Sequence, residues 1–424
     1  MTAAYPIRPI SDSEFPAFYA VIEHAFNTSY PTEPELQHDL ATFEFDRTLA
    51  AFDGTQMVGT AAAFTLQMTV PGNTATVAGV TAVAVLPSHR RRGILSSLMD
   101  RQLADIRDRG EAVAALFSAE SGIYGRYGYG AASAELAFTI RRGEGVMAPP
   151  GPGRTKDAPR LRSAHPQHAK GALAEVYDYV QRSRPGMPAR DDRWWEYTLW
   201  DPEHRRSGSS PMRCVLAEDD SGPRGYALFS ATPDWGDHGM PSGVLRVQEL
   251  MAADPAAHAA VWGDLLTRDL IAEFRARARP VDDPLPYLLA DGRRARAQLV
   301  DGLWVRLVSV PEALTRRRYA CAVDVVIDVA DELLAENAGR WRLRAAAQTG
   351  PGGPTAPASA SCERTSAPAD VALPVRALGA AYLGGTRLGA LAGAGLAAEM
   401  RPGALAALSA ALAWDPAPWC PAIF

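Results

Sequence analysis

The feature that most constrains the fold is residues 80–95, VTAVAVLPSHRRRGIL, where an apolar run ends in three arginines and a glycine. The run Val80–Leu86 is apolar at both odd and even positions apart from one threonine, a pattern typical of a strand buried on both faces of a sheet. From Gly93 to Asp108 the apolar residues change to helical spacing. A strand buried on both faces and followed at once by a helix predicts a layered α/β domain.

Capping and turn signals extend this prediction to about residue 145. Ser11 or Asp12, with Glu14 nearby, can cap a helix that follows a short strand. The sequences DG at 53–54 and PGN at 71–73 each lie between two apolar runs and therefore predict hairpins. Together with a further buried strand after the long helix, the expected order of elements is β-α-β-β-β-α-β-α.

The same order recurs after a linker rich in proline and glycine, Val146–Pro159. Aligning Val80 with Val247 superimposes the two central strands, and a helix is expected over His258–Phe274. The second copy has ADPAAHAAVW where the first has LPSHRRRGIL, so it lacks the basic, glycine-containing turn. We therefore expect a second α/β domain of the same architecture without the chemistry of that turn.

The pattern changes again from about Gly302. Strands are expected over Trp304–Val308, Cys321–Val329, Gly339–Ala346 and Ala369–Pro374, helices over Val375–Ala381 and Leu405–Leu412, and a loop over Thr349–Ser361. The last eleven residues, WDPAPWCPAIF, are apolar and stiffened by proline, whereas a charged and flexible terminus is the usual case. We therefore expect the tail to be anchored.

Composition excludes several classes of protein. A net charge of −5 argues against binding to nucleic acid or another polyanion. The four cysteines are far apart and form no CxxC pair, so neither a metal site nor a disulfide framework is predicted. The N-terminus lacks the features of a secretory signal, and the longest apolar run, Leu388–Ala398, is too short to span a bilayer. A soluble, cytoplasmic protein is the default expectation.

The basic turn has the chemistry of an anion-binding site. A helix that starts directly after a strand leaves backbone N–H groups free, and its dipole favours an anion there. Gly93 permits close approach of a ligand, and Arg90, Arg91 and Arg92 supply donors that suit phosphate oxygens. The Walker and GxGxxG patterns are absent, which disfavours an NTPase or a dinucleotide site. The alternative is a basic surface turn that binds nothing.

A second motif, SGIYGRYGYG at 121–130, follows one strand later. If a thioester is attacked by an amine, its sulfur leaves as a thiolate, which a nearby phenol can protonate. Tyr124 is the candidate for that general acid. The alternative is a tight turn with packed aromatic rings.

HRRRG followed by ESGIYGRYGYG strongly resembles the Eis (enhanced intracellular survival) family of GNAT N-acetyltransferases, and the resemblance covers the whole chain. It implies an active GNAT domain (1–146), a degenerate second one (147–299) and a sterol-carrier-like α+β domain (300–424). It also implies acetyl-CoA as co-substrate, with no metal, and a homohexamer.

The resemblance also implies roles for individual residues. Pantetheine would bind to backbone groups of the splayed strand, the pyrophosphate to the following turn and helix start, and the end of the next strand would lie opposite. The C-terminal carboxylate of Phe424 would be the general base, with Tyr124 as the acid. The implied cofactor-binding residues are Val83, Ala84, Val85, Arg90, Arg91, Arg92, Gly93, Ile94, Leu95, Ser96, Ala119 and Glu120.

The resemblance implies an amine acceptor, either a small molecule such as an aminoglycoside or polyamine, or a lysine side chain. Such cations need acidic partners, for which Glu23 and the segment Glu33–Asp46 are candidates, although both can equally be solvated helix faces. Aromatic residues that could shape the pocket, or pack in the core, are Phe26, Tyr30, Phe43, Phe45 and Phe64. Two other functions stay open: a lipid or sterol carrier acting through the C-terminal domain, and a scaffold.

Overall fold

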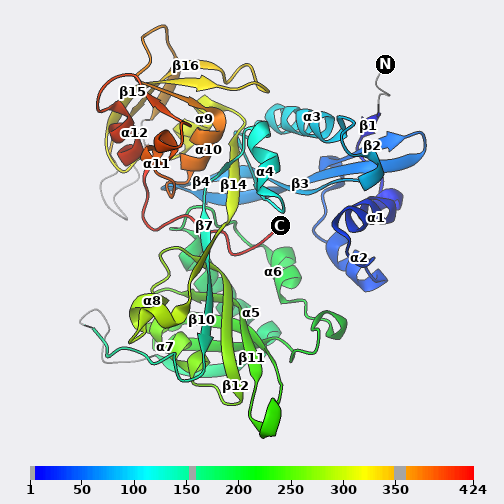
Figure 1. Cartoon of the computed structure of the whole chain (residues 1–424), viewed down its shortest axis with the longest axis vertical. Coiled ribbons are helices and arrows are strands. Elements are labelled where there is room, and N and C mark those ends of the chain that lie inside the picture. The colour runs from blue at the N-terminus through cyan, green and yellow to red at the C-terminus, as the bar shows by residue number, and fades with distance from the viewer. Residues whose placement is uncertain (1–4, 152–158, 348–359) are drawn as a thin grey trace. The chain divides into compact units, whose positions relative to one another are not determined.

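The computed structural model describes residues 5–151, 159–347 and 360–424. The chain forms two compact units, the first made of residues 1–133, 302–418 and 422–424 and the second of residues 134–301 and 419–421 (Figure 1). Each unit therefore contains segments that are far apart in the sequence. Within the described residues, no helix is both long enough and apolar enough to cross a membrane.

The first unit contains a seven-stranded sheet in the order β1-β2-β3-β4-β5-β14-β6. The expected hairpins are confirmed, because β2 pairs with β3 and β3 with β4 across the two turn signals. The strands are β1 Ile7–Arg8, β2 Thr48–Asp53, β3 Gln56–Val70, β4 Asn73–Val85, β5 Val113–Phe117, β6 Gly130–Ala131 and β14 Leu303–Leu307, and the helices of this part are α1 Phe15–Phe26, α2 Glu33–Leu40, α3 Ile94–Asp108 and α4 Ser121–Tyr124.

Helices cover both faces of this sheet, which explains why its strands are apolar at successive positions. In β2, Ala50 and Phe52 pack in the cluster that contains α1 residues, whereas Leu49 and Ala51 pack in the cluster under α3. The capping box expected before α1 is present, with Ser11 and Glu14 as its two members.

The second unit repeats this arrangement, with strand order β8-β9-β10-β11-β12-β7-β13 when its sheet is read from the other edge. In both sheets the fourth and fifth strands are parallel and the sixth is antiparallel to the fifth. The strands are β7 Ala134–Arg141, β8 Arg160–Ala164, β9 Arg213–Asp219, β10 Gly222–Thr232, β11 Gly243–Ala252, β12 Ile271–Pro280 and β13 Gln298–Asp301, and the helices are α5 Pro166–Gln181, α6 Asp192–Leu199, α7 Pro255–Leu266 and α8 Leu285–Leu288.

One expected helix of this copy is too long. The helix predicted over His258–Phe274 ends at Leu266, and Ile271–Phe274 belongs instead to β12. There Phe274 pairs with Leu245 of the central strand, so pairing with the parallel neighbour prevails over the helical spacing of the apolar residues.

The sixth strand of each sheet comes from an unexpected part of the chain. β7, which follows the glycine-rich motif at 121–130, pairs with β12 and β13 in the second sheet. β14, which follows the second copy, pairs with β5 and β6 in the first sheet. The predicted domain boundaries stay a prediction: 1–146, 147–299 and 300–424. Because β7 and β14 each belong to the sheet of the other copy, no single cut in the sequence separates the two sheets.

The C-terminal region adds a third sheet of five strands, in the order β17-β16-β15-β18-β19. Its helix α10 also packs closely on the first sheet: a Cβ built on Gly379 would lie 2.3 Å from the carbonyl oxygen of Val305 in β14. The predicted loop Thr349–Ser361 lies almost entirely outside the described residues. The elements are β15 Val323–Ala330, β16 Gly339–Ala345, β17 Ser361–Arg364, β18 Val371–Pro374, β19 Ala398–Glu399, α9 Val310–Arg316, α10 Val375–Tyr382, α11 Leu388–Gly393 and α12 Ala404–Leu412.

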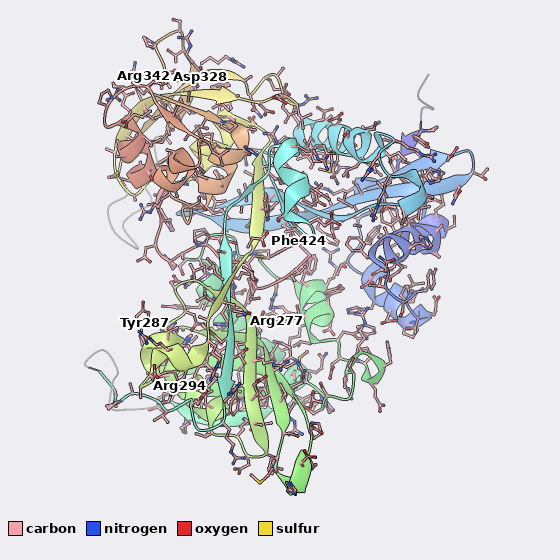
Figure 2. The ribbon with its side chains drawn as sticks, in the orientation of Figure 1. Arg277, Tyr287, Arg294, Asp328, Arg342 and Phe424 are labelled. Carbon is pink, nitrogen blue, oxygen red and sulfur yellow. The ribbon has the colours of Figure 1, made fainter. Side chains whose placement is uncertain are left out.

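The C-terminal tail is anchored, as its composition predicts. Pro418 lies against Gly385, where an added Cβ would be 2.7 Å from the proline ring. Trp419 is buried in the second unit, where its indole N–H donates to the carbonyl oxygen of Ala278 at 2.8 Å. Phe424, labelled in Figure 2, ends the tail. Its ring packs edge-on against Phe117 of β5, with the ring centres 5.6 Å apart.

Candidate active site

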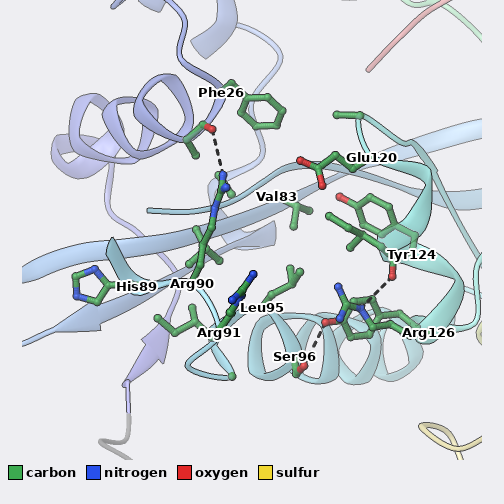
Figure 3. Close-up of a pocket in the computed structure, with 18 of the residues that line it drawn as sticks. Phe26, Val83, His89, Arg90, Arg91, Leu95, Ser96, Glu120, Tyr124 and Arg126 are labelled. Atoms are coloured by element: carbon green, nitrogen blue, oxygen red, sulfur yellow. Dashed lines mark hydrogen bonds between the residues drawn. The ribbon is translucent and has the colours of Figure 1, made fainter. Parts of the chain in front are cut away.

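A cleft of about 820 Å³ opens in the first unit where β4 ends and α3 begins (Figure 3). Its walls come from the end of α1, the end of β4, the turn and the first turn of α3, the end of β5 and the glycine-rich segment at 121–127. The residues that line it are Ala25, Phe26, Asn27, Val83, Ala84, Val85, His89, Arg90, Arg91, Gly93, Ile94, Leu95, Ser96, Ala119, Glu120, Ile123, Tyr124, Arg126 and Tyr127.

Strands β4 and β5 diverge at this cleft. They are paired from Val77 to Gly79, opposite Val113 to Ala115, and β4 then continues to Val85 beyond the last of these pairs. The β3–β4 register shifts near Ala82, whose φ of +53° is unusual for a residue with a side chain. Among the described residues, no strand pairs with this edge of β4 beyond Gly79, so it can bind an extended ligand by backbone hydrogen bonds, and its end lines the cleft.

The turn after β4 leaves the first N–H groups of α3 available. Gly93 occupies the N-cap position with a φ of +84°, so no side chain caps the helix. In the second copy, Asp254 caps α7 and its carboxylate accepts from the N–H of Ala257 at 2.9 Å. The first copy thus offers its helix terminus to an external anion, whereas the second copy satisfies its own.

The three arginines of the turn differ in direction. Arg91, at a φ of +63°, and Arg90 both line the cleft, and Arg90 also donates to the carbonyl oxygen of Ala25 at 3.4 Å. The side chain of Arg92 is not among the lining residues; it donates to the Tyr5 hydroxyl at 3.1 Å. Two guanidinium groups therefore face the cleft, and the third holds the N-terminal segment.

Sequence reasoning missed two basic residues that line the cleft. His89 stands in the turn with Nδ1 2.9 Å from Ser88 Oγ and Nε2 3.2 Å from Asp53. Arg126 donates to the carbonyl oxygen of Ile123 at 3.2 Å and lies over the Tyr127 ring. Both residues were visible within the quoted motifs, but nothing in their spacing indicated that their side chains would meet the same cleft.

Tyr124 lies in the cleft wall, with its hydroxyl pointing toward Val83 and Glu120 (Figure 3). Burial, with smaller contributions from Tyr127 and Glu120, raises the pKa of the Tyr124 phenol to about 12. The phenol is therefore protonated at neutral pH and can donate a proton. The alternative expectation, a tight turn with packed aromatic rings, applies to the neighbouring Tyr129. Its side chain is fully buried, and its ring lies edge-on to that of Tyr124, with the ring centres 5.9 Å apart.

Phe424 is not among the residues that line this cleft, yet it lies at the point where the two strands diverge. Its ring packs on Phe117 of β5 and beside Gly79, the last residue of β4 that is paired with β5. A Cβ added at Gly79 would lie 3.1 Å from the Phe424 ring, so this glycine leaves room for the ring.

Most of the acidic residues expected to attract a cation have structural partners. Glu23 accepts from Thr28, Glu44 accepts from the Thr65 hydroxyl at 2.6 Å, and Asp46 pairs with Arg109 at 2.9 Å. Glu35 forms a capping box with Thr32, and the buried Asp39 accepts from Tyr19. The carboxylate that does line the cleft is Glu120, which is exposed.

The aromatic candidates divide in the same way. Phe26, nearly half exposed at 47%, lines the cleft. Phe43 and Phe45 pack on Phe15 inside the first unit, with ring centres 4.8 and 5.9 Å from it. In the parts of the chain that the structure describes, no group of three or more His, Cys, Asp or Glu side chains is arranged to hold a metal ion.

Comparison with protein families gives three matches along the chain. Residues 6–132 and residues 186–307 each match an acetyltransferase (GNAT) domain. Residues 310–421 match a sterol carrier protein domain. The expected fold class, two tandem GNAT domains followed by a sterol-carrier-like domain, is thereby confirmed.

Known proteins match over most of their length. The N-acetyltransferase Eis of Mycobacterium tuberculosis is 34% identical over 85% of this chain and 84% of its own. An uncharacterized N-acetyltransferase of Streptomyces avermitilis is 42% identical over 98% of both chains. The crystal structure of Eis1 from Mycobacterium abscessus matches with a TM-score of 0.81 and 31% identity, covering 99% of this chain and 100% of that one.

Proposed function

The chain belongs to the Eis family of GNAT N-acetyltransferases, and from this premise we propose that it transfers the acetyl group of acetyl-CoA directly to a primary amine. The observation that carries the proposal is the uncapped start of α3 beside the divergent end of β4, within one cleft that also contains Tyr124. We propose that the helix start binds the pyrophosphate, the strand edge binds the amide-containing arm, and Tyr124 lies beside the thioester.

The residues present fit acetyl-CoA. Val83, Ala84 and Val85 would pair with the pantetheine arm, in the manner of an added strand. Residues 91–96 would bind the pyrophosphate with backbone N–H groups, assisted by the guanidinium groups of Arg90 and Arg91. Ala119 and Glu120 would border the opposite side. A cleft of about 820 Å³ is within the range of sites for ligands of this size.

The proposed chemistry needs one acid and one base. The amine nitrogen attacks the thioester carbonyl carbon, the carbon–sulfur bond breaks, and Tyr124 protonates the departing thiolate. The proton lost by the amine passes to the terminal carboxylate of Phe424. A free α-carboxylate has a pKa of about 3.3–3.7, so we propose that burial raises this value or that a water molecule relays the proton. No covalent enzyme intermediate is required.

The acceptor is proposed to be a cation, either a small molecule such as an aminoglycoside or polyamine, or a lysine side chain. Glu120 supports this because its carboxylate lines the cleft, whereas Glu23 and the acids of 33–46 are engaged elsewhere. Acetylation of aminoglycosides would give antibiotic resistance. From the family we also expect a homohexamer in the cytoplasm, which sedimentation and cell fractionation can test.

The test of the proposed function is a thiol-release assay with acetyl-CoA and a panel of amines: aminoglycosides, polyamines and lysine-containing peptides. We expect amine-dependent release of CoA and an acetylated product of matching mass. Tyr124→Phe serves as the matched control, which should release CoA more slowly than the wild type. Absence of turnover with every amine, in protein that binds acetyl-CoA, would reject the proposal.

Lipid carriage through the C-terminal domain is the other candidate from the sequence. A carrier needs an apolar chamber in this domain. α10 is buried except at Arg376, and its Gly379 packs on the backbone of β14 in the first sheet. These contacts give no specific support to a carrier.

A further inference from the structure

Arg306 is a fully buried arginine in the sixth of the seven strands of the first sheet. It lies in β14, where it pairs with Ala114 of β5, and its side chain is 0% exposed. Its neighbours along the strand, Val305 and Leu307, are buried and apolar. A guanidinium group in such a position is costly unless it is fully engaged, so its presence requires an explanation.

The charge of Arg306 is balanced by the C-terminal region. Nη2 donates to both carboxylate oxygens of Asp331, at 2.8 and 2.7 Å, and Asp331 is itself buried. Asp331 also accepts from Asn337 Nδ2 at 3.0 Å, and Asn337 donates to the carbonyl oxygen of Leu307 at 3.2 Å. Asp331, held by Asn337, therefore fixes the guanidinium group of this arginine in place; we call these two residues its seat.

The other side of the guanidinium group faces the segment that carries Tyr124. A Cβ built on Gly128 would lie 2.7 Å from Nε of Arg306 and 2.8 Å from Cζ, so the backbone of the turn packs directly on the guanidinium group. Gly128 has a φ of +82°, and the N–H of the next residue, Tyr129, donates to the carbonyl oxygen of Tyr124 at 3.2 Å. The turn that orients Tyr124 thus rests on Arg306.

The degenerate copy indicates that the fold itself does not need this arginine. Arg306 pairs with Ala114, which pairs with Ala78 of the central strand. Under the alignment of Val80 with Val247, the same sequence of pairs in the second sheet runs from Leu245 through Phe274 to Ile140. Ile140 is 1% exposed and packs in an apolar core. The copy without the basic turn thus has an aliphatic side chain where the first copy has Arg306.

We propose that Arg306, seated by Asp331, is a positioning residue that fixes the turn at 125–129 and thereby holds the Tyr124 phenol in the cleft. The inference rests on the proposed role of Tyr124 as the general acid. It assigns the C-terminal region a part in catalysis beyond its last residue, because Asp331 belongs to that region. Displacement of a reacting group by about 1 Å can cost up to a hundredfold in rate.

The test is a double-mutant cycle between Arg306→Lys and Tyr124→Phe. Lysine keeps the charge of Arg306 but lacks the flat group on which the turn packs. We expect Arg306→Lys to lower kcat by about tenfold to a hundredfold while the KM for acetyl-CoA changes by less than about twofold. In the Tyr124→Phe background the same substitution should cost less than about twofold, because no acid remains to be positioned.

Arg342→Lys is the matched control. Arg342, labelled in Figure 2, also contacts both carboxylate oxygens of an aspartate, Asp324, at 2.8 and 2.7 Å, but through two nitrogens, Nε and Nη2, and at a partly exposed position on the third sheet. It should leave kcat unchanged. If Arg306→Lys does not fold, Asp331→Asn enters the same cycle, since it weakens the seat and leaves the arginine in place.

The outcomes separate the two claims. If Tyr124→Phe is slow and Arg306→Lys still lowers its kcat by the same factor as in the wild type, the positioning role of Arg306 is rejected and the acid role of Tyr124 is not. A kcat for Arg306→Lys equal to that of the wild type also rejects the positioning role. A wild-type rate for Tyr124→Phe rejects the acid and, with it, any residue proposed to position the acid. Loss of the Arg306→Lys effect in the slow Tyr124→Phe background supports the inference.

Discussion

Replacing Phe424 by alanine tests whether the ring at the end of the chain places the terminal carboxylate. The substitution keeps the carboxylate and removes only the ring, which packs on Phe117 and beside Gly79. If turnover requires the carboxylate to stay where β4 and β5 diverge, losing the ring should raise the activation free energy by about the free energy that holds the ring there.

That free energy has two parts. An edge-on aromatic pair contributes about 0.5–1.5 kcal/mol beyond the area that it buries. Full burial of a phenylalanine side chain contributes about 1.5–3 kcal/mol, and the half-buried Phe424 ring therefore gains about 1 kcal/mol. The sum of about 2 kcal/mol corresponds to a decrease of about thirtyfold in turnover.

The assay is release of CoA thiol at saturating acetyl-CoA with one active amine. Ile423→Ala is the matched control, because Ile423 is the preceding residue and is 75% exposed. We expect the control to change turnover by less than about twofold. Equal rates for the two variants, or a wild-type rate for Phe424→Ala, would refute the claim that the ring places the base.

Five further predictions concern the C-terminal tail, Tyr124, the basic turn and one buried ion pair. One residue added after Phe424 should cripple turnover and leave acetyl-CoA binding intact, as measured by calorimetry; unchanged turnover would reject the terminal base. Tyr124→Phe should slow acetyl transfer by about 10²–10⁴-fold. Because the pKa of Tyr124 is raised to about 12, the phenol stays protonated as the pH rises. We therefore expect no decrease in kcat due to Tyr124 below about pH 10. A decrease at lower pH that disappears in Tyr124→Phe would contradict this. Arg91→Ala should raise the KM for acetyl-CoA by about tenfold or more, whereas Arg92→Ala should not, since Arg92 is bonded to Tyr5; equal effects would contradict the assigned directions. Arg47→Met should lower the free energy of unfolding by about 3–5 kcal/mol in chemical denaturation, because it leaves the buried Glu111 unpaired; a change below about 1 kcal/mol would oppose this.

Patterns that act over a few residues predicted much of the fold and of the cleft. The apolar run of β4, the glycine at 93 and the helical spacing after it are local constraints, and each appears in the structure where the sequence indicates. The difference between the two copies was also visible, since the second copy lacks the basic turn; the structure adds that Asp254 caps α7, whereas Gly93 leaves α3 without a side-chain cap.

The sequence did not predict which way the side chains point or which residues they bond. RRRG reads as one basic turn, yet Arg90 and Arg91 line the cleft and Arg92 bonds to Tyr5. The acids between 33 and 46 could have faced a ligand, but their hydrogen bonds are made to residues such as Thr65 and Arg109. These choices depend on contacts between segments distant in the sequence.

The sequence by itself determined most of the order of strands, turns and helices and the position of the basic turn, because these depend on neighbouring residues; it missed α2 and took the start of β12 for helix. Only the tertiary structure decided that β14, from beyond residue 300, completes the first sheet and places Arg306 against Gly128. Strand pairing between distant segments selects among several compatible apolar strands by the packing of the whole sheet, and a local pattern does not encode that choice.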